Sequence, residues 1–164
     1  MQEKTIELTV NVPTALLVQA LVDNIMNGNP LPSDRDNSIP KIGTHWKAQG
    51  GIYAGVMSGL DGAPDYHLIV GPAFEYATWD EQKLAVFRLS ADGFNDFTLP
   101  DRQEQALQFA NVPELFESEW YWSGTQHASN SDYAWCQGFG DGDQHCRNKD
   151  GKLRARAVRR LIIQ

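Results

Sequence analysis

Cysteine and histidine side chains are the first candidates for chemistry in this chain. A nucleophile needs a base within hydrogen-bonding reach and a third group that orients the base. The available side chains stand in no recognised catalytic motif; they are Cys136, Cys146, His67, His127 and His145. We therefore predict no catalytic residues and a protein that is not an enzyme.

The spacing of the same residues disfavours a metal site. Zinc sites use short pairs such as C-x2-C or H-x3-H because a short loop aims two ligands at one ion, whereas nine residues separate Cys136 from Cys146. The only acidic cluster, Gly140-Asp141-Gly142-Asp143, is better explained as a hairpin turn than as the dense oxygen array that calcium needs. We predict no metal ligand and no cofactor.

A hairpin around this tetrapeptide brings the two cysteines near each other. With a three-residue loop, 140–142, counting outward along the strands makes Cys136 face Cys146. Directly opposed residues on antiparallel strands have Cβ atoms about 4.5–5.5 Å apart, somewhat beyond the usual disulfide spacing. A bridge is then marginal, and a two-residue loop would break the pairing, so the sequence leaves the pairing open.

The charges of the chain are unevenly distributed. The formal net charge is −7, yet half of the 14 basic residues lie in one stretch near the C-terminus: Arg147, Lys149, Lys152, Arg154, Arg156, Arg159 and Arg160. A net-negative protein repels phosphate backbones, so we predict no nucleic-acid partner. The basic run itself is typical of a strand whose arginines are solvated or paired with nearby acids.

The first ten residues are charged and alternating, without the apolar region of a signal peptide. No run approaches the roughly 18 apolar residues of a membrane span, and two cysteines are too few for a disulfide scaffold. We predict synthesis in the cytoplasm without a signal peptide and no membrane insertion. Later association with a virion is left open.

The N-terminal part has a pattern of its own. Residues 5–10 alternate as in a half-buried strand, and residues 14–26 carry a wide apolar helical stripe. Such a face needs a partner, so this appendage, residues 1–28, is expected to pack on the body or to form a homo-oligomer through residues 5–26. Residues 29–45 are rich in turn formers and are predicted to be a linker or irregular loop.

The remaining segment, residues 46–164, combines strand and helix patterns. Strand-like runs at 51–57 and 66–70 flank a Gly/Pro/Asp turn and predict a hairpin. Thr78 can cap a helix over 80–89, a second helix is expected at 102–111, and the late segment alternates short strands with polar turns. The predicted class is α+β.

Several motifs of this segment occur together in a known family. They are Gly50-Gly51-Ile52-Tyr53, residues 65–72, Phe97-Thr98-Leu99-Pro100-Asp101-Arg102, residues 120–125, Tyr133-Ala134-Trp135 and residues 154–160. In this order, over about residues 46–161, the chain resembles the Lcl C-terminal-like domain family of phage and prophage proteins. The resemblance implies a C-type-lectin-like fold with two helices and a twisted antiparallel sheet. Formylglycine-generating enzymes and the variable proteins of diversity-generating retroelements share that fold.

The resemblance and the composition indicate the same binding region. Trp120, Trp122 and Trp135 are expected to be core or groove walls, and small polar residues between 123 and 152 surround the aromatic residues there, as in paratopes. An ordinary polar loop with an edge strand would have the same composition, so this alternative stays open. Carried over from the variable proteins, the candidate contact residues are His127, Asn130, Asp132, Cys136, Gly138, Asp141, Asp143, His145, Arg147 and Asn148.

Three functions are compatible with these features. The first is a non-catalytic ligand- or receptor-binding protein of phage or prophage origin, with a protein or a cell-surface glycan as its partner. The second is an intracellular phage accessory protein that binds and inhibits a host protein, for which an acidic body suits a basic partner. The third is a small lectin-fold enzyme. Whether the late segment is diversified is left open by one sequence.

Overall fold

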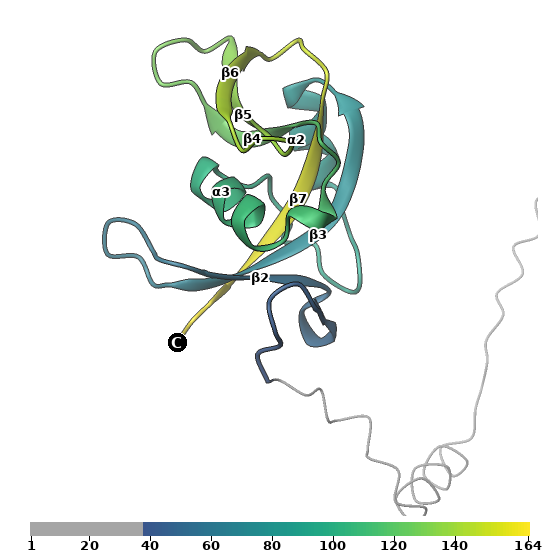
Figure 1. Cartoon of the computed structure of the whole chain (residues 1–164), viewed down its shortest axis with the longest axis vertical. Coiled ribbons are helices and arrows are strands. Elements are labelled where there is room, and N and C mark those ends of the chain that lie inside the picture. Colours follow the sequence, from purple (N-terminus) through teal and green to yellow (C-terminus); the bar gives the residue numbers. More distant parts are fainter. Residues whose placement is uncertain (1–37) are drawn as a thin grey trace, which may run out of the picture. The chain divides into compact units, whose positions relative to one another are not determined.

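The structure, a computed structural model, describes residues 38–164 (Figure 1). The elements are β1 (His45–Trp46), the 3-10 helix η1 (Lys47–Gln49), β2 (Gly51–Met57), β3 (Tyr66–Ala77), α2 (Trp79–Phe87), α3 (Arg102–Asn111), the 3-10 helix η2 (Pro113–Leu115), β4 (Trp120–Gln126), β5 (Tyr133–Gly138), β6 (Gln144–Asn148) and β7 (Leu153–Ile162). The predicted appendage 1–28, with its strand, helix and self-association, and most of the predicted linker 29–45 lie outside the described residues.

One seven-stranded sheet has the order β1-β2-β3-β7-β4-β5-β6. All neighbouring strands are antiparallel except β4 and β7, which are parallel at Tyr121 and Arg154. Figure 1 shows the last strand, β7, running beside β3 and on towards β4, so that it joins the two halves of the sheet. The α+β class and the mostly antiparallel sheet with two α-helices are confirmed for residues 38–164.

Helix α2 begins where its cap predicts. Thr78 accepts a hydrogen bond from the backbone N–H of Glu81, and the Glu81 carboxylate accepts one from the N–H of Thr78 in return. This reciprocal pair satisfies two N–H groups that the first turn would otherwise leave free. The helix ends at Phe87, two residues before the predicted end, and Arg88 is its C-cap.

Helix α3 spans the predicted residues, 102–111. Asp101 and Glu104 form a second capping box, and the buried Glu104 also accepts a hydrogen bond from the Tyr66 hydroxyl at 2.8 Å. The cap therefore anchors α3 to the start of β3. Both α-helices are short, and among residues 38–164 no helix has the length and apolar character needed to cross a membrane.

The β2–β3 hairpin has the predicted strands, but β3 runs seven residues past the predicted end at Val70, to Ala77. Pro72 lies in this extension, at a point where the β3–β7 register shifts between Val70 and Ala73. Proline cannot donate to a ladder, so it is tolerated in a strand at such an irregularity. The Gly71-Pro72 pair therefore marks an irregularity within the strand.

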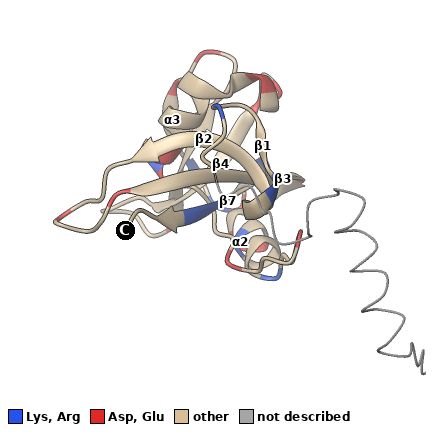
Figure 2. Ribbon diagram, turned by 90° about the horizontal axis from the view of Figure 1, so that it is seen from below, with Lys and Arg blue, Asp and Glu red and all other residues tan. Residues whose placement is uncertain are grey.

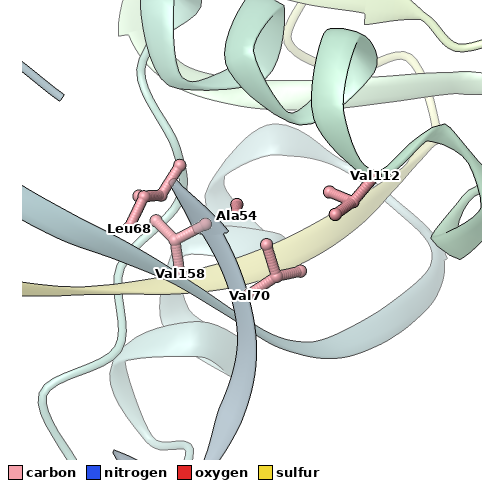
Figure 3. Packing of buried hydrophobic residues seen from close by; sticks show 5 residues of the cluster. All are labelled: Ala54, Leu68, Val70, Val112 and Val158. Atoms are coloured by element: carbon pink, nitrogen blue, oxygen red, sulfur yellow. The ribbon is translucent and has the colours of Figure 1, made fainter. Parts of the chain in front are cut away.

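One of the buried clusters of the core is aliphatic. Ala54, Leu68, Val70, Val112 and Val158 form one buried cluster (Figure 3). They come from β2, β3, β7 and the C-cap of α3, so the cluster joins the first hairpin to the last strand and to the helix between them. Burial of such side chains contributes about 1.5–3 kcal/mol each to the free energy of unfolding.

The arginines of β7 are held by groups on neighbouring elements. The ion pairs are Arg154–Glu75 at 2.7 Å, Arg159–Asp96 and Arg160–Glu104 at 2.5 Å. Arg156 instead donates to the carbonyl oxygen of Leu115. Basic and acidic positions of the domain are coloured in Figure 2, where blue segments lie on β7. The predicted pairing of the basic run with acids is confirmed for three of its arginines.

Candidate functional site

The ten predicted contact residues all belong to the β4–β5–β6 part of the sheet and its loops. His127, Asn130 and Asp132 lie between β4 and β5, Cys136 and Gly138 on β5, Asp141 and Asp143 in the hairpin loop, and His145, Arg147 and Asn148 on β6. His127 is half-buried. Seven of the ten are exposed: Asn130, Asp132, Asp141, Asp143, His145, Arg147 and Asn148.

Two of the predicted positions are not on the surface. Cys136 is fully buried in a cluster with Trp79, Trp122 and Ala134. Gly138 is buried as well, and an added Cβ would lie 2.9 Å from a carboxylate oxygen of Asp141. Both residues lie on β5, which is covered at its edges by β4 and β6. The expectation that Cys136 and Gly138 lie on the exposed contact surface is therefore corrected.

The β5–β6 hairpin does not have the register that a three-residue loop would give. Cys136 faces His145, and Cys146 faces Trp135. The Gly138 N–H donates to the Asp143 carbonyl oxygen at 2.9 Å, which leaves four loop residues, 139–142, in place of three. A shift of one residue turns a side chain to the other face of the sheet, and both thiols are free.

The exposed candidates separate into two groups at opposite ends of β6. Asp141 and Asp143 belong to the hairpin loop, which packs on α3: Gly142, at φ +85°, lies against the Phe109 ring. At the other end, the Lys149 N–H donates to the Asp132 carbonyl oxygen at 2.9 Å. Four residue steps along β6 correspond to roughly 13 Å, so the two groups cannot contact one small ligand together.

A cleft of about 510 Å³ lies beside the second group. We call it the edge cleft; its lining residues are Trp120, Tyr133, Cys146, Arg147, Asn148, Gly151, Lys152 and Leu153. Its volume is within the range of about 300–1,000 Å³ that small-molecule sites occupy. The edge cleft therefore combines two predicted contact residues, Arg147 and Asn148, with residues that were not predicted.

Trp120 is the aromatic wall of the edge cleft. Its ring is half-buried, with the His145 ring centroid at 5.6 Å and the Arg147 guanidinium carbon at 5.3 Å. A cation at this distance is attracted by the negative face of an indole. Trp122, two residues later in the chain, is fully buried and belongs to the core. Of the two predicted roles, Trp122 is therefore a core residue and Trp120 a cleft wall.

The cations of the edge cleft have no acidic side chain within ion-pair distance among residues 38–164. In the part of the chain that the structure describes, neither Arg147 nor Lys152 forms an ion pair within 4 Å, and no lining residue is acidic. Lys149 lies nearby but donates to the Gln126 side chain at 2.6 Å. Lys152 belongs to the basic run of the sequence, and that run was the signal that could have identified it.

A second polar group lies towards α3. The Arg102 guanidinium stacks on the Trp135 ring at 3.4 Å, and its Nε donates to Gln144 at 3.1 Å. The Gln144 amide in turn donates to Gln137 at 2.7 Å. Because each of these groups already has a partner, this arrangement fixes α3 to the sheet and leaves little for a ligand to bind.

Cys136 is poorly suited to act as a nucleophile. Burial raises the pKa of its thiol to about 11, with Arg147 opposing the rise. A thiol reacts as the thiolate, so a group with this pKa is almost entirely in the unreactive form at neutral pH. Within residues 38–164 no three His, Cys, Asp or Glu side chains come together as metal ligands.

No model of a known protein family matches this chain, and no curated protein matches it either.

Proposed function

We propose that residues 38–164 form a C-type-lectin-like binding module of phage or prophage type, which binds a protein or cell-surface glycan at the edge cleft. The chain order supports this fold: both α-helices lie between the first hairpin and the β4–β5–β6 strands, and the last strand returns to pair with β3. The motifs from Gly50 to Arg160 that resemble the Lcl C-terminal-like family span the same elements.

The edge cleft is the observation that carries the proposal. It places an aromatic ring, a guanidinium, an ammonium and an amide near β6, the last strand of the sheet among residues 38–164: Trp120, Arg147, Lys152 and Asn148. A few converging polar groups beside an aromatic wall are typical of ligand sites. The neighbouring loop, residues 127–132, is mostly exposed and polar and could contact a larger partner.

We propose a role at the virion surface for this module. A phage protein that recognises its host needs a stable frame and an exposed, chemically varied surface, and both are present in residues 38–164. The frame is supplied by β2, β3 and β7 with their ion pairs and aliphatic core. The surface is supplied by β6 and the loops beside it. Catalysis is not part of the proposal.

The test compares two variants of the full chain, each with substitutions at one end of β6 or in the turn beyond it. The cleft variant carries Arg147→Ala, Asn148→Ala and Lys152→Ala, and the loop variant carries Asp141→Ala and Asp143→Ala. Each variant loses one short side-chain turn, because Asn148 accepts from the Asp150 N–H and Asp141 accepts from the Asp143 N–H. All five residues are exposed, so each substitution should cost within about 0.5 kcal/mol of stability.

Ligands are sought on a glycan array and by pull-down from bacterial lysate, with all three proteins. We expect the wild-type chain and the loop variant to bind the same ligand, and the cleft variant to lose it at an unchanged melting temperature. Full binding by the cleft variant would contradict the proposed site. A turnover reaction abolished by Cys136→Ser alone would contradict the non-catalytic function.

A further inference from the structure

His67 is a buried titratable side chain that has no role in the proposed binding function. It lies on β3, is 7% exposed, and packs against Trp46 of β1 and Tyr53 of β2, with ring centroids 5.4 Å apart in each of the three pairs. We infer that protonation of His67 on acidification releases residues 43–49 from the sheet, so that β2 becomes the edge strand at that end. The proton comes from solvent and binds to a ring nitrogen.

Few backbone bonds hold residues 43–49 to the sheet. Strand β1 has two residues and pairs with β2 alone. Beside it, the Gly43 N–H donates to the Tyr53 carbonyl oxygen at 2.9 Å, and the Tyr53 N–H donates to the Thr44 carbonyl oxygen at 3.0 Å. A segment with so few bonds can open locally at a smaller free-energy cost than global unfolding.

Trp46 is the one buried side chain of residues 43–49. It belongs to a cluster with Tyr53 and Ile69, against which Leu161 also packs. The Trp46 indole N–H has no hydrogen-bond partner within the described part of the chain. The ring is therefore held by packing, and its attachment depends on the state of the aromatic side chains beside it.

Protonation changes what the His67 ring can bind. In the neutral ring, Nδ1 can accept a hydrogen bond from the Tyr53 hydroxyl, which lies 3.1 Å away. The imidazolium donates from both nitrogens, so the hydroxyl proton loses this acceptor. A charge enclosed by apolar side chains costs free energy unless an opposite charge lies beside it, and burial accordingly lowers the pKa of His67.

The charged groups around His67 do not supply that opposite charge. No carboxylate lies within 4 Å of its ring nitrogens among residues 38–164. The acid nearest in sequence, Asp65, accepts the Gly59 N–H at 3.0 Å. The titratable and charged groups on the surrounding elements are His45 and Lys47 on β1 and η1, Tyr53 on β2, Tyr66 on β3, and Arg159 and Arg160 on β7, both paired with acids.

The direction of the pH effect follows from the lowered pKa. Release of the Trp46 ring uncovers His67, which then takes a proton as an exposed histidine does. Attachment of residues 43–49 is therefore complete above the ordinary pKa of 6.5 and weakens as the pH falls from there towards the lowered value.

The experiment is amide hydrogen exchange of the full chain at about pH 7.5 and about pH 5.5, with rates corrected for the intrinsic effect of pH on exchange. We expect the protection of the Gly43 and Tyr53 amides to fall about threefold or more at the lower pH. The Val158 N–H, which donates to the Thr98 carbonyl oxygen in the core, should change by no more than about 1.5-fold.

Two variants locate the effect. His67→Asn keeps an acceptor for the Tyr53 hydroxyl but does not titrate, so the protection of Gly43 should be the same at both pH values. His45→Asn removes an exposed histidine from β1 itself and should keep the pH dependence of the wild-type chain.

A titration of the wild-type histidine rings by nuclear magnetic resonance gives a readout that does not depend on a variant. We expect the midpoint of His67 to lie below 6.5. A midpoint at or above that value would overturn the inference, because the aromatic rings would then stabilise the imidazolium. It is also overturned if Gly43 is protected equally at both pH values, if Val158 loses protection to the same extent, if His67→Asn keeps the pH dependence, or if His45→Asn abolishes it.

Discussion

Two successive strands, β6 and β7, use basic residues in opposite ways. On β7, between β3 and β4, arginines are paired with Glu75, Asp96 and Glu104. On β6, at the edge of the sheet, Arg147 has no acidic partner among the described residues. The same residue type therefore stabilises the sheet where neighbouring segments supply carboxylates, and has no such partner on β6, the last strand of the sheet among residues 38–164.

The largest effect is expected for a tryptophan of the core. Trp122→Ala removes a fully buried ring and should lower the free energy of unfolding by about 3–5 kcal/mol. Trp120→Ala, at the half-buried wall of the edge cleft, should lower the free energy of unfolding less than Trp122→Ala does, and should lower the affinity for a ligand more. Urea denaturation of both variants measures the difference, and equal losses would mean that the two rings do not differ in role.

The arginines themselves give the next effect. Arg160→Gln leaves the buried Glu104 carboxylate without its cation. We expect the free energy of unfolding to fall by about 2–3 kcal/mol, less than for a fully buried pair because Arg160 is partly exposed. Arg147→Gln should cost within about 0.5 kcal/mol. If chemical denaturation showed the reverse order, the division between frame and binding strand would be wrong.

Alkaline pH should weaken the frame through Tyr66. Burial, followed by the hydrogen bond to Glu104, raises the pKa of the Tyr66 hydroxyl to about 12 from its usual value near 10. The folded state therefore favours the protonated phenol, and this contribution is complete below pH 10 and is lost as the pH rises towards 12. The stability difference between wild type and Tyr66→Phe, measured by urea denaturation, should shrink across that interval. A difference independent of pH would exclude this coupling.

The smallest effect concerns the reactivity of two thiols. Because the pKa of Cys136 is raised to about 11, only about one part in a thousand is thiolate at pH 8, and its side chain is inaccessible. We expect a thiol reagent to label Cys146, which is half-buried, first. Labelling of Cys146→Ser should be slow until denaturant is added; fast labelling of that variant would show that Cys136 is accessible.

Local patterns of the sequence were sufficient for most helices and strands. Thr78 with Glu81 defines the start of α2 because a capping box depends only on residues three apart. The β2 strand and α3 follow from side-chain periodicity in the same way. The continuation of β3 through Pro72 could not be predicted, since it depends on pairing with β7, which lies more than 80 residues later in the chain.

The sequence by itself determined the α+β class of the segment predicted at 46–164, and it directed attention to the late polar segment. Only the tertiary structure decided which residues of that segment are at the surface. Cys136 is buried because its side chain packs with Trp79, Trp122 and Ala134 on one face of the sheet, and Gly138 is buried against Trp120 and Asp141. The cysteines do not oppose each other because a four-residue loop shifts the register by one. The edge cleft also needs Trp120 from β4 beside Arg147 from β6 and Lys152 from the following turn. No local pattern of the sequence predicts that these three residues lie together, because their proximity depends on how distant strands pair and on which strand is at the edge of the sheet.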